Sequence, residues 1–306
     1  MSSVSNRKLK AEKDSMIPLS KRARFLLTYF QHQNWSLPNS IIYYILKNPS
    51  NSKVYQKLIQ CCKYFFFKNP IIVVDKFTID GDEKWKATLK DDEKFIDFTK
   101  ISTKLWIYDV FDKYCFSNTS ANPLNLVSSV IPQIYRCDAE CMFIDKQIIS
   151  YNEFLFLTSN IKFITLSKTP IMNENGTIVP LEKLVKKLPK LISFVYYDSL
   201  TSSSITSNTL KELLEIPHFS KITQWRLYKI PEKFDIETFY TFFKKGKVAN
   251  FYLDFAVSIS QAYKNRLESI VDEILETRNE DDKTPYIDFN GLSLEKKLKL
   301  QRLHYC

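Results

Sequence analysis

Short β-rich segments that contain aromatic residues recur from residue 105 onward, and this rhythm constrains the fold more than any other feature. The first aromatic residues of successive segments lie 26 to 35 positions apart. The segments are Leu105–Tyr108, Ile134–Cys137, Phe163–Leu166, Phe194–Tyr197, Trp225–Tyr228, Phe251–Asp254 and Tyr286–Phe289. A period in this range is typical of solenoids, in which stacked units cover one another's apolar faces. We therefore expect these segments to lie side by side as parallel strands, with helices on the outer face.

Helical patterns lie between these segments. In residues 181–188 the apolar side chains recur at helical spacing on one face, and the pattern ends before Pro189. The same arrangement recurs in residues 210–214, 239–243 and 267–275. Alternation of strands and helices predicts an α/β fold with a parallel sheet over residues 71–306, either a solenoid or a non-repeating α/β domain.

One strand–helix unit also resembles a known repeat. Residues Leu188–Ser199 read Leu-Pro-Lys-Leu-Ile-Ser-Phe-Val-Tyr-Tyr-Asp-Ser. This stretch resembles a degenerate leucine-rich repeat, whose usual pattern is Leu-x-x-Leu-x-Leu-x-x-Asn/Cys. Aromatic residues replace many of the leucines here, and the Asn/Cys position is irregular. The resemblance implies an α/β solenoid of leucine-rich-repeat-like units.

The residues before this region predict three further segments. Residues 1–20 are polar and charged without an apolar period, which predicts a disordered basic arm. Ile71–Val74 is β-branched and predicts a buried strand. The charged stretch Asp80–Lys94 predicts a loop or a surface hairpin.

Two short helices with surplus apolar side chains are predicted between residues 36 and 68. Pro38 suits the first turn of a helix, and Ser36 can cap it. Asn48–Asn51 ends the first helix and supplies a cap for the second. The apolar sides comprise Ile41, Ile42, Ile45 and Leu46 in the first helix, and Val54, Leu58, Cys61, Cys62 and Phe65 in the second.

This pair of helices resembles the F-box, and is similar to the expanded F-box families of nematodes. In that family Leu-Pro precedes paired aliphatic residues, a polar turn and a second helix that ends in apolar-Cys-Lys/Arg-x-aromatic. Leu37-Pro38 and Cys61–Phe65 match the two ends of the pattern. Ser40 departs from it, because F-boxes usually carry an acidic residue at that place. The alternative is an ordinary helical hairpin at the start of an α/β domain.

The resemblance implies three parts: the arm (1–20), an F-box-like helical domain (21–70) and the solenoid domain (71–306). It implies a substrate-receptor subunit of a cullin-RING (SCF-type) ubiquitin ligase. The helices would dock on a Skp-family adaptor, and through it on a cullin, while the solenoid would hold an unknown protein substrate. The residues expected to anchor the adaptor or close the hairpin are Leu37, Pro38, Ile41, Ile42, Ile45, Leu46, Leu58, Cys62 and Phe65. The alternative function is a non-catalytic repeat scaffold or a nucleic-acid-binding protein without ligase association.

Residues that carry catalysis or bind cofactors are scarce. The sequence has only 4 Gly, and it contains neither a P-loop motif nor a dinucleotide-binding motif. Each of the 3 His is isolated in the sequence from a Cys, Ser or acidic residue that could form a catalytic pair with it. The 6 Cys form no C-x-x-C pair, so we expect free thiols in a reducing compartment and no metal site. We therefore expect no enzyme and no cofactor.

Charge and hydropathy bear on partners and location. The net charge of +10 permits nucleic-acid binding, but no RNA- or DNA-binding motif accompanies it, and nucleic acid is not the expected partner. The longest apolar runs are far shorter than a membrane span, and no signal peptide is recognisable. We expect no membrane partner and a cytoplasmic or nuclear location.

Overall fold

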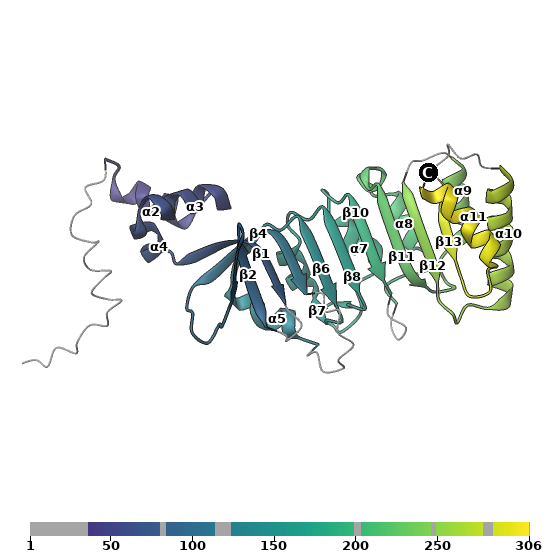
Figure 1. Ribbon diagram of the computed structural model, residues 1–306, viewed down its shortest axis with the longest axis horizontal. Helices are drawn as coiled ribbons and strands as arrows, with labels where there is room; N and C mark the ends of the chain where they lie inside the picture. The colour runs from purple at the N-terminus through teal and green to yellow at the C-terminus, as the bar shows by residue number, and fades with distance from the viewer. Residues whose placement is uncertain are drawn as a thin grey trace, which may run out of the picture. The chain divides into compact units, whose positions relative to one another are not determined.

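The computed structural model describes residues 36–79, 84–113, 124–198, 203–245, 249–277 and 284–305. The chain divides into two compact units, Met1–Pro70 and Ile71–Cys306 (Figure 1). The division falls where the sequence changes from a helical pattern to the β-branched run that begins at Ile71. The predicted disordered arm, residues 1–20, lies outside the described residues.

The small unit contains three short helices in its described part. They are α2 (Asn39–Lys47), α3 (Ser52–Cys61) and α4 (Lys63–Lys68). Pro38 directly precedes α2 with φ −56°, and no side chain caps this helix, so the prediction of a Ser36 cap is wrong. The predicted cap of α3 is confirmed, because the Asn51 side chain accepts the N–H of Val54 at 2.9 Å.

The predicted second helix is interrupted at Cys62. This residue is extended, with φ −154° and ψ 126°, and its Sγ accepts the N–H of Tyr64. Within α3, Val54 and Cys61 are exposed rather than part of the apolar side that the sequence predicted. Tyr55 is fully buried instead, and its hydroxyl donates to the Asn69 carbonyl. The buried side of α3 therefore contains a hydrogen-bonded tyrosine, where the sequence pattern had predicted aliphatic residues.

The large unit is a mixed α/β fold around one large, mostly parallel sheet. Its strands follow the order β13-β12-β11-β10-β8-β6-β4-β1-β2-β3 (Figure 1). The strands are β1 (Ile71–Ile79), β2 (Trp85–Leu89), β3 (Asp92–Phe95), β4 (Lys104–Lys113), β6 (Cys141–Asp145), β8 (Phe163–Ser167), β10 (Ser193–Tyr197), β11 (Gln224–Ile230), β12 (Asn250–Phe255) and β13 (Tyr286–Asp288).

The predicted parallel arrangement of the aromatic segments is confirmed. From β1 to β13 along the sheet, each strand is parallel to its neighbour. On the other side of β1, β2 and β3 form an antiparallel hairpin. This hairpin also confirms the surface hairpin predicted within Asp80–Lys94, for residues 84–94. One segment differs from the simple rhythm. β5 (Ile134–Cys137) pairs with the first part of β4, and β6, which the spacing missed, pairs with the last part.

Helices connect the strands, and most of them cover one face of the sheet, whereas His304 of the last helix packs against Tyr252 and Tyr286 on the other face. The helices are α5 (Leu126–Val130), η1 (Ile131–Gln133), α6 (Tyr151–Leu157), α7 (Leu181–Lys186), α8 (Thr209–Leu214), η2 (Phe219–Lys221), α9 (Ile236–Lys244), α10 (Gln261–Thr277) and α11 (Leu294–Tyr305). A small second sheet pairs β7 (Ile149–Ser150) with β9 (Ile171–Met172). At the end of the large sheet, α11 contacts both β13 and α10 (Figure 1).

The two faces of the sheet differ in burial. On the helix-covered face, Trp225 of β11 packs against Phe194 and Phe219, with ring centroids 5.2 and 5.1 Å away. The alternate residues of the same strand, Arg226 and Tyr228, are only half-buried. Because successive side chains of a strand point to opposite faces, the sheet has one core face and one face that stays accessible. We call the accessible one the open face, and its central residues are Thr165, Val195, Tyr197, Arg226, Tyr228, Tyr252 and Tyr286.

Candidate binding surfaces

Apolar side chains on one side of α2 and just before it remain exposed among the described residues of the small unit. Leu37 is 48% exposed, Ile41 45% and Tyr44 67%. Ile41 and Tyr44 are three residues apart on the same side of the helix, and Leu37 lies two residues before its first residue, Asn39. We call these three residues the α2 apolar face. A contiguous apolar surface of this kind is typical of a site that binds another protein.

The predicted anchor residues fall into three groups. Leu37, Pro38 and Ile41 are exposed, whereas Ile45, Leu58 and Cys62 are half-buried. The buried group, Ile42, Leu46 and Phe65, forms the core of the small unit.

The structure thus places Ile42 and Leu46, which were expected to be adaptor anchors, inside the hairpin. Their spacing of four residues brings both onto Phe65, and the opposite side of α2 remains exposed. Sequence reasoning missed Tyr44. The signal that could have found it is its position three residues after Ile41.

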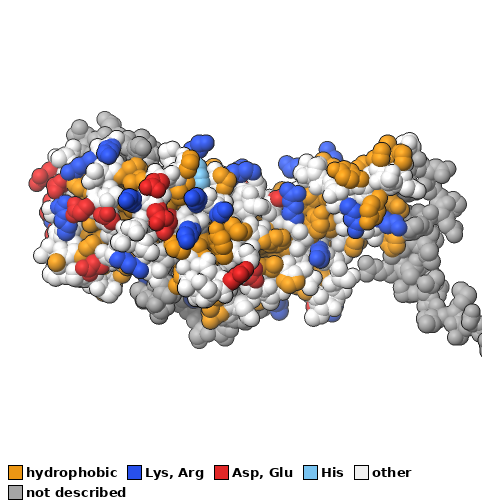
Figure 2. Space-filling model, turned by 180° about the vertical axis from the view of Figure 1, so that it is seen from behind, with side chains coloured by type: hydrophobic (Ala, Val, Ile, Leu, Met, Phe, Trp, Pro, Cys, Tyr) orange, Lys and Arg blue, Asp and Glu red, His pale blue; other side chains and the backbone are white. Residues whose placement is uncertain are grey.

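The small unit is also strongly basic. Residues 36–70 contain no Asp or Glu. Their five lysines, Lys47, Lys53, Lys57, Lys63 and Lys68, are all exposed. The ammonium group of Lys47 lies 5.7 Å from the ring centroid of Tyr43 on α2. In Figure 2 hydrophobic side chains of this unit lie next to Lys or Arg side chains. A partner of the α2 apolar face would therefore gain from acidic groups around its own apolar surface.

Stacked tyrosines dominate one end of the open face. The rings of Tyr228 and Tyr252 are 5.0 Å apart, and those of Tyr252 and Tyr286 are 4.8 Å apart. Tyr252 and Tyr286 are opposite each other in register and stack, because neighbouring strands are about 4.8 Å apart. Tyr228 lies diagonally from Tyr252, which is opposite Arg226, and its ring is tilted by 37°. Burial raises the pKa of Tyr252 and of Tyr286, and both hydroxyls stay protonated at neutral pH. This part of the face therefore offers hydroxyl donors.

A pocket of about 550 Å³ lies where β11, β12 and β13 end. Asp254 and Asp288 are opposite each other in register, and the Lys297 ammonium lies 2.7 Å from Asp288 Oδ1. Burial, followed by the charge of Asp288, raises the pKa of Asp254, while Lys297 and Lys229 lower it. Each carboxylate thus has a cation beside it. The pocket is close to neutral overall, which is more typical of a stabilising ion-pair cluster than of a reactive site.

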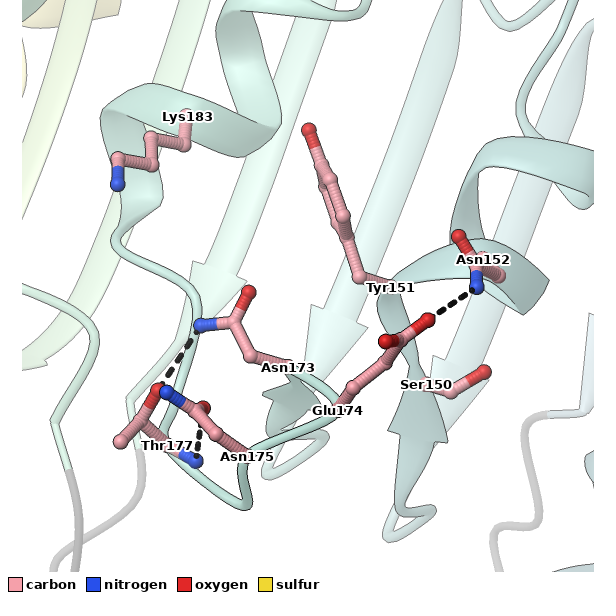
Figure 3. A pocket seen from close by; sticks show the side chains of 8 residues that line it. All are labelled: Ser150, Tyr151, Asn152, Asn173, Glu174, Asn175, Thr177 and Lys183. Atoms are coloured by element: carbon pink, nitrogen blue, oxygen red, sulfur yellow. Dashed lines mark hydrogen bonds between the residues drawn. The ribbon is translucent and has the colours of Figure 1, made fainter.

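A second pocket, of about 560 Å³, lies between the start of α6 and the loop that precedes α7 (Figure 3). Its polar side chains bond mainly to one another. Asn152 Nδ2 donates to Glu174 Oε1 at 3.2 Å, and Asn173 Nδ2 donates to Thr177 Oγ1 at 3.0 Å. These bonds hold the loop 173–177 in place. Because the polar groups are already engaged, this pocket is a weaker candidate than the open face.

The described residues contain neither a candidate metal cluster nor a membrane-spanning helix. Within the described ranges, no group of three or more His, Cys, Asp or Glu side chains is placed to hold a metal ion. Burial raises the pKa of the Cys137 thiol to about 12, so this thiol is protonated and unreactive at neutral pH. None of the described helices combines the length and the apolarity that crossing a bilayer requires.

The comparisons with known proteins add no relatives. No family model matches the chain, and no curated protein matches it.

Proposed function

We propose that this chain is a substrate-receptor subunit of a cullin-RING ubiquitin ligase. The small unit is an F-box that docks on a Skp-family adaptor, and the large unit is a leucine-rich-repeat-like solenoid that holds a target protein. The chain itself carries out no bond chemistry. It acts by proximity, because holding a target near a ubiquitin-charged enzyme raises the effective concentration of the acceptor lysine.

The observation that carries this proposal is the α2 apolar face. Leu37, Ile41 and Tyr44 are about half exposed or more, on or just before a helix whose other side already forms the core of the unit. Ile41 and Tyr44 are spaced as helical anchors for a partner groove, and Leu37 adds an apolar side chain just before the helix. The F-box pattern accounts for the same Leu-Pro start and for the surplus of apolar side chains. The anchor set is therefore revised to Leu37, Ile41 and Tyr44, while Ile42 and Leu46 support the helix from inside.

The topology of the large unit supports the solenoid. From β4 onward, the strands on the main path of the large sheet (β4, β6, β8, β10, β11, β12 and β13) lie in the sheet in the same order as in the chain. The helices between them, such as α7 and α8, contact each other in the same order. Each strand–helix unit contributes residues to one continuous core and is too small to bury its apolar face alone.

The first experiment is co-precipitation of the full chain with a purified Skp-family adaptor. Wild-type chain should retain the adaptor at micromolar concentration. Ile41→Asp should abolish retention, because it places a charge in the centre of the apolar contact. Val54→Asp is the matched control, since Val54 is 41% exposed on α3 and outside the α2 apolar face.

Thermal melting followed by circular dichroism accompanies the binding measurement. Both variants should melt like the wild type, because the replaced side chains are exposed. Failure of the wild type to bind the adaptor would reject the F-box proposal and favour a repeat scaffold without ligase association. Equal loss of binding in Ile41→Asp and Val54→Asp would reject the assignment of the α2 apolar face.

A further inference from the structure

The edge of the large sheet at which the strands begin carries a row of exposed lysines. They are Lys186, Lys187 and Lys190, which precede β10, Lys221, which precedes β11, and Lys245, which precedes β12. Within the part of the chain that the structure describes, none of them forms an ion pair, and the Lys190 ammonium donates to the neutral Asn160 Oδ1 at 2.6 Å. We call these five lysines the basic edge.

Backbone hydrogen bonds join the loops of this edge into one surface. The N–H of Ile192 donates to the Lys162 carbonyl at 2.8 Å, and the N–H of Thr223 donates to the Ile192 carbonyl at 2.9 Å. The N–H of Asn250 continues the series, because it donates to the Thr223 carbonyl at 2.8 Å. Neighbouring loops are therefore held about one strand spacing, 4.8 Å, apart. The lysines that these loops carry form a row with a fixed order.

A pocket of about 390 Å³ lies among these lysines, between the loop before β11 and the end of α9. The aromatic part of its lining is fixed by the stacking of Phe219 on Phe242, whose ring centroids are 5.8 Å apart. The pocket can therefore receive an apolar side chain without rearrangement. Its apolar lining comprises Leu214, Ile216, Phe219 and Phe242, and its polar rim comprises Glu215, Ser220 and Lys245.

Positive charge prevails around the pocket. Lys245 lines it, and Lys221 directly follows Ser220 of its rim. The exposed carboxylates of the same part of the chain are Glu215, which also lines the pocket, and Glu212 on α8. Five lysines without ion pairs thus outweigh two glutamates, and the surface attracts a partner of negative charge.

The helix dipole accounts for only part of the basic edge. Cations are favourable at the C-terminus of a helix, which explains Lys186 and Lys187 at the end of α7 and Lys245 at the end of α9. Lys190 and Lys221 lie four and seven residues beyond the ends of α7 and α8. The effect of the dipole falls off within the last turn, so these two lysines do not serve to stabilise the helices.

The rings of the pocket favour a peptide over a nucleic acid. Phe219 packs on Trp225 at 5.1 Å between centroids, and Phe242 meets Phe251 edge to face at 6.3 Å. Few of their ring faces are available for stacking on bases, on which binding of single-stranded nucleic acid depends. An apolar pocket among ammonium groups instead matches a peptide that carries an apolar side chain between carboxylates.

We propose that the basic edge and its pocket bind a short acidic segment of the target protein. One large aliphatic side chain of this segment enters the pocket, and Asp or Glu carboxylates on either side of it face Lys190, Lys221 and Lys245. The inference rests on the proposed function only in treating the segment as part of the target. Because ammonium groups act as point charges without a fixed fork, Asp and Glu are equivalent at these positions.

The test measures the retention of nine-residue peptide libraries on beads that carry the full chain. The first library has a central Leu, Asp or Glu at the two positions on each side of it, and uncharged residues elsewhere. In the second library Asn or Gln replaces the acidic residues, and in the third Ser replaces the central Leu. Wild-type chain should retain the first library at least about tenfold more than either of the others. Raising the NaCl concentration from about 0.05 M to about 0.3 M should reduce the preference for acidic residues, because exposed charges are screened.

Variants separate the contribution of the lysines from that of the pocket. The double change Lys221→Gln and Lys245→Gln should lower the preference for acidic residues at least about threefold. The matched control is Lys168→Gln with Lys183→Gln, two exposed lysines after β8 and near the start of α7, at the edge where the strands end. This control removes the same charge and should keep the preference.

Two single variants act in other directions. Glu215→Gln should raise retention of the first library, because it removes a like charge from the rim. Ser220→Trp should place a ring in the pocket and remove the preference for Leu over Ser, while the preference for acidic residues remains. All of the replaced side chains are exposed, and circular dichroism melting should show that the variants fold like the wild type.

Four results would overturn the inference. They are equal retention of the first and second libraries by the wild type, a preference for acidic residues that the Lys221 and Lys245 variant keeps in full, a preference for Leu that survives Ser220→Trp, and stronger retention of a ten-nucleotide oligothymidylate than of the first library. The last result would indicate nucleic acid as the partner. Any of them alongside intact adaptor retention would leave the proposed function standing. Loss of adaptor retention by a chain that keeps its peptide preference would reject the proposed function alone.

Discussion

The rings of Tyr197 and Tyr228 lie 4.0 Å apart between centroids, with their planes only 3° from parallel. They belong to neighbouring parallel strands, β10 and β11, and are opposite each other in register. The stack depends on the register of β10 and β11, because a slip of one residue would move one of the two rings to the core face.

This stack predicts a measurable contribution to stability. Tyr228→Ala should lower the free energy of unfolding by about 1 to 2 kcal/mol, from lost stacking and lost apolar burial of a half-exposed ring. Tyr228→Phe keeps the ring and should stay within about 0.5 kcal/mol of the wild type. Urea unfolding of both variants checks the prediction, and equal stability of all three proteins would show that the stack adds nothing.

A second prediction concerns the core under α7. Leu184 is 1% exposed and lies on the apolar side of the helix. Leu184→Asp should cost several kcal/mol, because it buries a carboxylate without a partner. Lys183→Asp on the exposed side of the same helix is the control and should change stability little. Unchanged melting of Leu184→Asp would mean that this side of α7 is not core.

A third prediction tests the start of α2. Replacing Leu37 and Pro38 together by Ala should abolish co-precipitation of the adaptor. Burial of the Leu37 side chain on docking contributes up to about 1.5–3 kcal/mol, and anchors of this kind dominate interfaces. The large unit should melt as in the wild type. A double variant that still binds the adaptor normally would place the docking surface elsewhere.

A fourth prediction uses the titration of His304. Burial, and then the charge of Arg226, lowers the pKa of this buried imidazole in the folded state. The unfolded chain therefore binds a proton at a higher pH than the folded chain. Stability falls as the pH drops below about 7 through the ordinary His value, and the loss is complete below the folded-state pKa.

The measurement is the difference in unfolding free energy between the wild type and His304→Gln from pH 7.5 to pH 5. The variant lacks the titrating ring, so the advantage of the wild type should shrink towards pH 5. An advantage that grows towards pH 5 would mean that the folded protein favours the charged imidazole, contrary to its burial.

Several features could be predicted from the sequence because they depend on the residues of one element. The aromatic and β-branched runs predicted β4, β5, β8, β10, β11, β12 and β13, and the repeated strand–helix alternation predicted that they are parallel. The apolar spacing of residues 181–188 predicted α7, which ends two residues earlier than expected, at Lys186. Asn51 predicted the start of α3, because a cap acts within its own turn.

Other features depend on contacts between elements that are distant in the chain, and only the tertiary structure decided them. Periodicity shows that Ile41 and Ile42 both belong to an apolar stretch, but packing on Phe65 buries Ile42 and leaves Ile41 exposed. Tyr55 of α3 is buried because its hydroxyl reaches the Asn69 carbonyl, a contact between distant residues that no spacing rule indicates.

Arg226, Asn250 and His304 illustrate the same limit. They come from β11, β12 and α11, and each is unremarkable in its own segment of sequence. Their proximity follows from the parallel order of the last strands and from the return of α11 against β13. A sequence pattern records which way a side chain faces on its own strand or helix. Only the assembled sheet determines which other side chains lie beside it and whether its charge has a partner.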